Sequence, residues 1–259
     1  MALLFDLQDV CFHYDRIPAL QRLSLQIAEG ESVALLGANG SGKSTLLRIL
    51  DALCFPAAGV ASFSGRPLTP ELMNQDGFAF SFRRKVSLVF QNPDVQLFNP
   101  TVFDEVAFGP LQLRWPKEEV LSKVAATLEL MSIAHLRDRP PYRLSGGEKK
   151  RVALASVIVL DPEVLLLDEP TSTLDPRSQS QIIDLIQEWK GSSKTVITAT
   201  HQLEIVEDIA GRIVVLEEGK VAASGAPAEI LSNHELLLRA NLVHAHRHSH
   251  GTYMHSHPH

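Results

Sequence analysis

The sequence of 259 residues lacks the features that mark several protein classes. It has two cysteines, Cys11 and Cys54, whose separation fits neither a metal-binding nor a redox motif, so we expect a reduced setting without disulfides. No apolar run approaches the roughly 18–20 residues that span a bilayer. The net charge of −6 disfavours a broad nucleic-acid or anionic-membrane surface. No secretory signal peptide is expected at the first residues.

What the chain does have is an ordinary globular composition and one strong motif near its start. The motif matches the phosphate-binding pattern G-x-x-x-x-G-K-[ST]. Its members are Gly37, Ala38, Asn39, Gly40, Ser41, Gly42, Lys43, Ser44 and Thr45. An apolar run at 33–36 precedes it and a helix-forming run at 46–50 follows, which is the strand-loop-helix context that the motif requires. Glycines let backbone amides approach an anion, and the helix adds its positive end.

The motif assigns roles to two of these side chains. Lys43 is expected to reach the β- and γ-phosphates of a nucleotide, and the Ser44 hydroxyl is expected to bind Mg²⁺. A chance glycine-rich turn is the alternative, and it does not explain why every fixed position is present.

A second candidate is the all-apolar run at 164–167, which ends in Asp168 and Glu169. A run that is apolar on both faces predicts a central parallel strand, and ligands bind at the carboxyl ends of such strands. Asp168 is placed to hold Mg²⁺, and Glu169 is placed to polarise an attacking water. The alternative is a strand that simply ends in acids at the surface.

The segment 144–151 reads Leu-Ser-Gly-Gly-Glu-Lys-Lys-Arg. Ser145 and Glu148 form the pattern of a capping box, so a helix is expected to begin here. Capping does not explain the consecutive glycines Gly146 and Gly147, because glycine lowers helix propensity. A second anion-binding site at this helix start is the functional interpretation.

Three single residues are weaker candidates. Tyr14 precedes the phosphate loop and is either an adenine-stacking residue or a half-buried strand tyrosine. Gln91 directly follows the strand-like run at 86–90 and precedes Pro93, so it is a candidate site residue at the end of a strand. His201 follows the apolar strand at 195–200 and is either a sensor of the γ-phosphate or a structural histidine.

The order of patterns predicts an α/β fold. Residues 3–30 alternate as antiparallel strands, residues 55–82 are rich in loops with a short strand at 60–63, and residues 95–160 read as a helical insertion. A hairpin at 212–225 and a helix at 226–238 complete one domain over 1–238.

Residues 239–259 form a tail with no apolar period, which is predicted to be disordered and rich in histidine. Imidazoles suit Ni²⁺, Cu²⁺, Zn²⁺ and Co²⁺, although such a tail does not select one metal. The alternative is a solvated tail that binds metal only incidentally. The candidate metal-binding residues are His244, His246, His248, His250, His255, His257 and His259.

Taken together, these motifs resemble the ATPase subunit of ATP-binding-cassette transporters over about residues 3–235. The matching positions, in chain order, are Tyr14, 37–45, Gln91, 144–148, Asp168 with Glu169, Asp175 and His201. The resemblance implies a P-loop NTPase core, an antiparallel β subdomain and a helical signature subdomain. It implies a head-to-tail dimer in which ATP lies between one phosphate loop and the partner's Ser145, Gly146 and Gly147, with Asp175 also near the partner. Gln91 joins Ser44 and Asp168 as an implied Mg²⁺ ligand.

A narrower likeness is to the energy-coupling-factor subfamily, which takes up vitamins and transition metals. It rests on Phe90-Gln91-Asn92-Pro93-Asp94, on Gln96-Leu97-Phe98 and on Asp104-Glu105-Val106-Ala107-Phe108-Gly109-Pro110, and the segment 144–151 fits it too. The resemblance, with the tail, predicts an ATP-hydrolysing subunit of a nickel or cobalt importer, and a vitamin importer is the alternative. It implies integral-membrane transport subunits as partners, a homodimer or a pair with a paralogue, and a place at the cytoplasmic face of the membrane.

A nickel-handling GTPase or metal chaperone is a rival of another class. Such a protein should carry a guanine-specific N-K-x-D motif, which the sequence lacks, and it would leave the segment 144–148 unexplained. A chromosome ATPase of the cassette type, and nucleic acid as a partner, are disfavoured because no long heptad insertion separates the two motifs.

Overall fold

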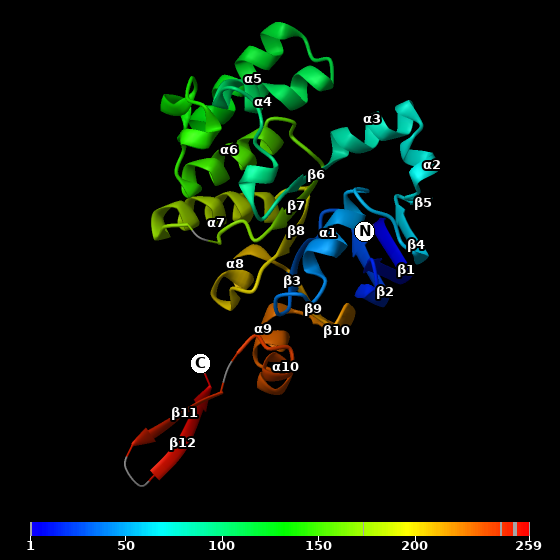
Figure 1. The fold of residues 1–259 in the computed structure, drawn as a ribbon, viewed down its shortest axis with the longest axis vertical. Coiled ribbons are helices and arrows are strands. Elements are labelled where there is room, and N and C mark those ends of the chain that lie inside the picture. Colours follow the sequence, from blue (N-terminus) through cyan, green and yellow to red (C-terminus); the bar gives the residue numbers. More distant parts are fainter. Residues whose placement is uncertain (1, 173, 244, 251–252, 259) are drawn as a thin grey trace.

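The computed structural model describes residues 2–172, 174–243, 245–250 and 253–258, the last two ranges by their main chain alone. The chain folds into a parallel-sheet core, an antiparallel sheet beside it and a group of helices (Figure 1). These are the three parts of the α/β fold that the sequence predicts.

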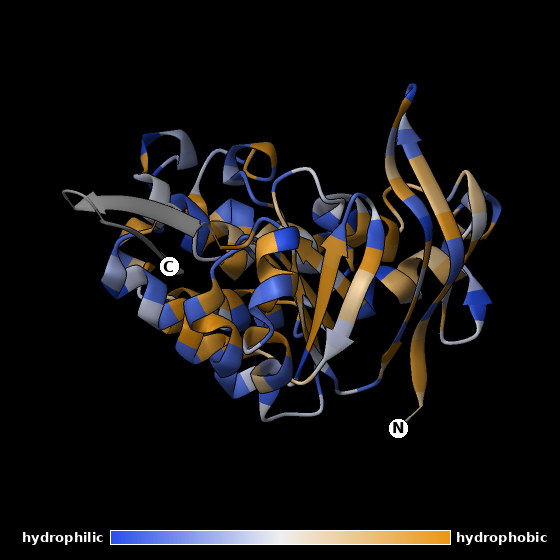
Figure 2. Cartoon of the chain, turned by 90° about the horizontal axis from the view of Figure 1, so that it is seen from below, coloured by the Kyte–Doolittle hydropathy of each residue, from blue (hydrophilic) through white to orange (hydrophobic). Residues whose placement is uncertain are grey.

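The core is a six-stranded sheet in the order β10-β9-β3-β8-β7-β6, parallel except at β10. Every residue of β3, β6, β7 and β8 is buried, as the predominantly apolar runs predict for strands covered on both faces. Figure 2 shows mainly hydrophobic strands at the centre of the molecule. The bounds are β3 (Ser32–Leu36), β6 (Val86–Val89), β7 (Val164–Asp168), β8 (Thr195–Ala199), β9 (Arg212–Glu217) and β10 (Lys220–Gly225).

The second sheet is antiparallel, in the order β2-β1-β4-β5. Its inward side chains and those of helix α1 (Lys43–Leu50) form one buried cluster with β3, so the helix that follows the phosphate loop is held between the two sheets. The bounds are β1 (Leu3–Tyr14), β2 (Ile17–Ala28), β4 (Ala58–Phe63) and β5 (Arg66–Pro67).

The helices that come after β6 in the chain cover the other face of the parallel sheet, around a second buried cluster. Those between β6 and β7 begin two residues before the stretch 95–160 that is expected to be a helical insertion, and the rest lie within it: η1 (Pro93–Val95), α4 (Val102–Gln112), α5 (Lys117–Leu130), η2 (Ala134–Leu136), η3 (Pro141–Arg143) and α6 (Gly146–Ile158). Those that follow β7 are α7 (Pro176–Lys190), η4 (Leu203–Ile205), α8 (Val206–Ile209), α9 (Pro227–Leu231) and α10 (His234–Arg239).

Two segments differ from the pattern-based expectation. The loop-rich stretch 55–82 also contains α2 (Pro70–Met73) and the start of α3 (Asp76–Lys85), which is stabilised by Phe82 packing edge-on against Phe63 with ring centroids 5.2 Å apart. The single helix expected at 226–238 is two helices, because Asn233 caps a new one by accepting a hydrogen bond from the Leu236 amide at 3.0 Å.

The tail also differs from its expectation. Disorder was the prediction from 239 onward, but α10 includes Arg239, and β11 (Ala245–His250) pairs antiparallel with β12 (Tyr253–Pro258). The side chains of the seven candidate tail histidines, His244 to His259, lie outside the described residues. Among the side chains that are described, no group of three or more histidine, cysteine or acidic residues is arranged to hold a metal. Within the described chain no helix is long and apolar enough to cross a bilayer.

Candidate active site

One cavity of about 430 Å³ brings together most of the predicted site residues. It opens at the carboxyl ends of β3, β6 and β7, where a parallel sheet places its ligands. The tip of the β1–β2 hairpin forms its other wall. The lining residues are Tyr14, Ile17, Pro18, Ala19, Asn39, Gly40, Gly42, Lys43, Ser44, Thr45, Gln91, Asp168 and Glu169.

The phosphate loop needs glycine at specific positions. Gly40 and Gly42 have φ angles of 83° and 106°, which L side chains rarely adopt. A Cβ atom at Gly42 would lie 2.7 Å from the carbonyl oxygen of Ala19, and one at Gly37 would overlap the carbonyl oxygen of Leu216. The loop is therefore packed tightly against β2 and β9, which fixes where its amides point.

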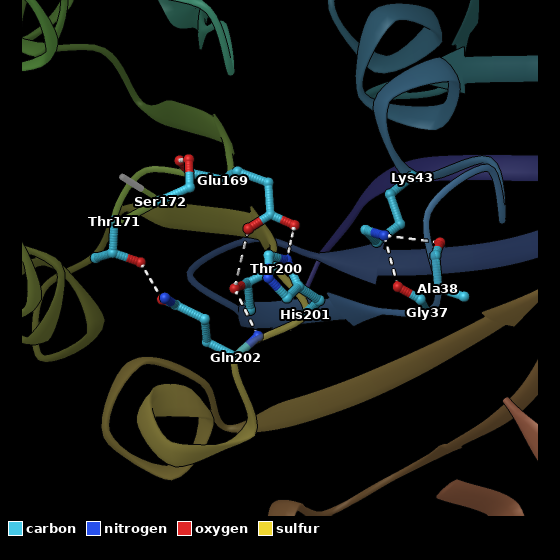
Figure 3. A network of polar contacts seen from close by, with 9 residues as sticks. All are labelled: Gly37, Ala38, Lys43, Glu169, Thr171, Ser172, Thr200, His201 and Gln202. Carbon is cyan, nitrogen blue, oxygen red and sulfur yellow. Dashed lines mark hydrogen bonds and ion pairs between the residues drawn. The ribbon is translucent and has the colours of Figure 1, made fainter. Parts of the chain in front are cut away.

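Lys43 lies at the first position of α1 and is 6% exposed. Its Nζ donates hydrogen bonds to the carbonyl oxygens of Gly37 at 2.6 Å and Ala38 at 3.1 Å (Figure 3). Burial lowers the pKa of Lys43, and the negative charges of Glu169 and Asp168 oppose that shift. The lysine thus bridges the loop while its charge faces the two acids at the end of β7.

Asp168 ends β7 with 6% of its surface exposed. Burial raises the pKa of this carboxyl, a hydrogen bond from Ser44 lowers it, and the charge of Glu169 raises it further. Its Oδ1 atom is buried and has no hydrogen-bond partner in the described part of the chain. A buried carboxylate oxygen without a donor is suited to a hard divalent cation, which prefers oxygen ligands.

Glu169 is 3% exposed and has a φ angle of 48°, unusual for a residue with a side chain. Its amide donates to the carbonyl oxygen of Ala199 at 2.9 Å, which holds this conformation. The carboxylate contacts two residues that follow β8: Oε1 lies 2.8 Å from Nδ1 of His201, and Oε2 accepts from Oγ1 of Thr200 at 3.4 Å (Figure 3). The predicted pair Glu169 and His201 is brought together.

Thr200 and Gln202 were missed by sequence reasoning. The Gln202 amide donates to Thr200 Oγ1 at 3.1 Å, and Thr171 Oγ1 donates to Gln202 Oε1 at 2.6 Å (Figure 3). These bonds hold the segment after β8 against the segment after β7, and so position His201 beside Glu169. Only their place at the end of a predicted buried strand could have suggested them.

Tyr14 lies at the hairpin tip with 44% of its surface exposed and its ring at the cavity wall. Its hydroxyl accepts a hydrogen bond from Arg48 of α1 at 3.0 Å, and its ring meets Phe12 edge-on with centroids 5.0 Å apart. Arg48 was not among the predicted site residues, because nothing in its sequence context links it to the hairpin.

The segment 144–148 is capped as predicted but does not line the cavity. The Ser145 amide donates to Glu148 Oε2 at 2.8 Å, and the Glu148 amide donates to Ser145 Oγ at 3.4 Å. Neither Ser145 nor the two glycines are among the described residues that line the cleft. A Cβ atom at Gly146 would meet nothing within 4 Å, so packing inside this chain does not require glycine there.

Asp175, the other residue predicted to face a partner, caps α7. Its Oδ1 accepts from the Ser178 amide at 3.1 Å and its Oδ2 accepts from the Ser178 hydroxyl at 2.6 Å. These bonds lower the pKa of its carboxyl. Within the chain its function is that of a helix cap.

Comparison with known proteins gives concordant matches. The family model described as ABC transporter matches residues 20–172. The nickel import ATP-binding protein NikO of Rhodobacter capsulatus is 55% identical over 242 residues, 92% of this chain and 95% of that protein. The energy-coupling factor transporter ATP-binding protein EcfA2 of Methanospirillum hungatei is 43% identical over 92% of this chain and 59% of its own length.

Solved structures agree with the sequence relatives. The cbiO1 protein of Clostridium perfringens, described as part of the ABC transporter complex cbiONQ, superposes with a TM-score of 0.76 at 35% identity, over 93% of this chain and 96% of that one. The bacterial ABC transporter cassette MJ0796, solved as a dimer, superposes with a TM-score of 0.79 at 28% identity, over 86% of this chain and 99% of that one.

Proposed function

The chain belongs to the ABC transporter family, and we propose that it hydrolyses ATP to drive an importer of nickel or cobalt ions. Membership makes it an ATP-binding subunit with ATPase activity. The observation that supports the cargo is the 55% identity to a nickel import protein along nearly the whole of both chains. A vitamin importer is the second candidate, favoured by the 43% identity to an energy-coupling factor subunit.

In the proposed mechanism the phosphate loop binds the triphosphate and Tyr14 stacks on the adenine. Tyr14 and the loop line one cavity, as a nucleotide that contacts both requires. The phosphates would replace the carbonyl oxygens of Gly37 and Ala38 as the partners of Lys43, so a buried ammonium exchanges weak partners for charged ones.

Mg²⁺ fits this site, since Asp168 has a buried Oδ1 without a donor in the described chain and Ser44 and Gln91 line the same cavity. These three residues would hold the ion. Bound there, it supplies positive charge that neutralises the phosphate oxygens.

Glu169 is the proposed general base for the attacking water. A buried carboxylate in the cavity wall can accept a proton from water, a contribution that is typically worth about 10²–10⁴-fold in rate. His201 contacts the carboxylate through Nδ1. With both ring nitrogens protonated, its Nε2 would donate to a γ-phosphate oxygen. Fixed donors near developing charge stabilise the transition state without reorganisation.

The second anion site is proposed to serve another subunit. Ser145 and Gly146 are exposed, and Gly146 has open space where a Cβ would be, so a partner's nucleotide can approach the start of α6 closely. We place Ser145, Gly146, Gly147 and Asp175 at this dimer contact. Integral-membrane transport subunits complete the assembly, with the ATPase at the cytoplasmic face of the membrane.

Uptake of radiolabelled nickel and cobalt into cells tests the cargo. Cells that express the chain with its membrane subunits should accumulate one of the two metals, and cells with the Glu169→Gln variant should not. Accumulation of neither metal, with labelled vitamins taken up instead, would favour the second candidate and overturn the first.

A further inference from the structure

A buried lysine connects the helix that starts at Ser145 with the chain around Gln91. Lys150 lies on α6 and is 2% exposed. Its Nζ donates hydrogen bonds to the carbonyl oxygen of Gln91 at 2.8 Å and to that of Phe90 at 3.3 Å. Both carbonyls belong to the loop that follows β6, and both hydrogen bonds are partly buried, so Lys150 supplies donors to main-chain oxygens that lie beyond the end of the strand.

A second side chain joins the same two segments from the loop side. Gln96 accepts a hydrogen bond from the Phe90 amide at 3.3 Å. Its Nε2 atom donates to the carbonyl oxygen of Ala153 at 2.8 Å and to the Ser156 hydroxyl at 3.0 Å, both on α6. The loop after β6 is therefore hydrogen-bonded to α6 in two ways. Lys150 of α6 binds two carbonyl oxygens of the loop, and Gln96 binds both the Phe90 amide and α6.

The two joined segments serve different nucleotides. Gln91 lines the cavity of its own chain, whereas Gly146 and Gly147, one turn before Lys150 on α6, stand at the surface proposed to meet the partner's nucleotide. One helical turn separates Lys150 from this helix start, so a shift of α6 moves both ends together.

We propose that Lys150 is a positioning residue that fixes the main chain of Gln91 to α6, so that the glutamine in one nucleotide site and the segment closing the partner's site move as one unit. The inference rests on the proposed function. Lys150 would thus couple the two nucleotide sites of a dimer through its hydrogen bonds to the carbonyl oxygens of Phe90 and Gln91, without itself contacting nucleotide.

The charge of the site favours lysine at this position. Burial lowers the pKa of Lys150 to about 8, and the negative charges of Asp168 and Glu169 oppose that shift. Two buried lysines, Lys43 and Lys150, thus face two buried acids at the end of β7. A methionine side chain, which has a similar length and no donor, would leave the Gln91 and Phe90 carbonyls without these hydrogen bonds.

The neighbouring lysine provides a matched control. Lys149 also links α6 to this loop, through an ion pair with Asp94 at 2.6 Å. The Asp94 side chain is 62% exposed, and solvent-exposed pairs contribute little. Substitution of Lys149 by methionine removes the same charge from the adjacent position while the hydrogen bonds of Lys150 to the loop remain.

The experiment compares Lys150→Met, Lys150→Arg and Lys149→Met, each in the full chain and each also combined with Glu169→Gln. ATP hydrolysis is measured at increasing ATP concentration. Binding of a fluorescent ATP analogue to the monomer and ATP-dependent dimer formation on a sizing column are measured separately in the Glu169→Gln background. Thermal unfolding identifies variants that fail to fold. If Lys150→Met fails to fold, Gln96→Leu replaces it, because that substitution removes the other hydrogen bonds between the loop and α6.

For Lys150→Met we expect kcat to fall about 10-fold or more, with the affinity of the monomer for the ATP analogue changed less than about 2-fold. Dimer formation should need about 10-fold more ATP, and the Hill coefficient should move toward 1. Lys150→Arg should restore most of each value, and Lys149→Met should match the wild type. Lys150→Met or its replacement with wild-type kcat and wild-type dimer formation overturns the inference. Absence of ATP hydrolysis in the wild type would instead overturn the proposed function.

Discussion

The carboxylate of Glu169 and the ring of His201 meet within a single chain, with Oε1 2.8 Å from Nδ1. The two residues follow neighbouring parallel strands, β7 and β8, and the Glu169 amide is bonded to the last residue of β8. The pair is thus positioned by the hydrogen bonding of the sheet itself. Loss of either side chain should affect the chemical step more than ATP binding.

Replacement of Glu169 by glutamine keeps the shape and the contact to His201 but removes the base. We expect ATP hydrolysis to fall about 10²–10⁴-fold, because general-base catalysis typically contributes on that scale, while ATP binding persists. A dimer stable in ATP should then appear in light scattering. Glu163→Gln, an exposed acid just before β7 that pairs with Lys85, is the control and should behave as wild type. Ordinary turnover in Glu169→Gln would contradict the assigned role.

Tyr14 offers a test of adenine stacking. Tyr14→Ala removes the ring from the cavity wall and should weaken ATP binding by roughly 5- to 150-fold, the equivalent of about 1–3 kcal/mol for base–aromatic stacking. Tyr14→Phe keeps the ring and loses only the bond from Arg48, so its affinity should stay within about 3-fold of wild type. Titration with a fluorescent ATP analogue measures both. Equal affinities for the alanine variant and for the control Tyr142→Ala, an exposed tyrosine away from the cavity, would rule out stacking.

Asp51 makes the stability of the fold depend on pH. It ends α1, and burial raises the pKa of its carboxyl from 3.8 to about 7, against the opposing charge of Arg83. Since the folded pKa is the higher one, the folded state holds a proton that the unfolded state has lost. The associated stability is complete below about pH 4 and is lost as pH rises through 7.

Asp51→Asn should therefore flatten the pH dependence of the free energy of unfolding between pH 5 and 8. Between pH 5 and 8 the free energy of unfolding of the wild type should fall by on the order of 2–4 kcal/mol more than that of the variant. Urea denaturation at several pH values measures it. Arg83 donates to the main-chain oxygen of residue 51 at 2.7 Å, so it keeps a partner in the variant. Parallel curves for variant and wild type would show that the carboxyl does not titrate in this window.

The histidine tail supplies a prediction about metal. Seven histidines lie within the last sixteen residues, and imidazole is a good ligand for Ni²⁺ and Co²⁺. Equilibrium dialysis should show binding of Ni²⁺ by the full chain and its loss when residues 244–259 are removed. ATP hydrolysis without added metal ion other than Mg²⁺ should change less than about 2-fold. Equal Ni²⁺ binding by the full and shortened chains would remove the tail as a metal site.

Local patterns predicted much of the core. The apolar runs before Gly37 and before Asp168 indicated buried parallel strands because both faces of such strands are covered, and β3 and β7 are buried throughout. The capping box at Ser145 is equally local, since its two hydrogen bonds join residues three positions apart. Features decided within one strand or one helical turn can be read directly from the sequence.

What the sequence could not show depends on contacts between distant residues. Lys150 and Gln91 are 59 positions apart, and Arg48 and Tyr14 are 34 apart, so no periodicity joins them. Lys150 reads as a surface residue in a run of basic residues, yet it is buried. Helix α3 was missed for a related reason: it is stabilised by Phe82 packing on Phe63, which belongs to β4 of the antiparallel sheet.

Because the start of α6 does not reach the cleft of its own chain, the proposed two-subunit site has a consequence for genetics. Consider a cell that carries one gene copy altered at Lys43 and another altered at Ser145. Homodimers of either altered chain would be inactive. The mixed dimer, however, would contain one site with both its lysine and its serine intact. Two individually inactive alleles should therefore complement each other, and partial metal uptake by such a strain would be the phenotype of a site shared between chains.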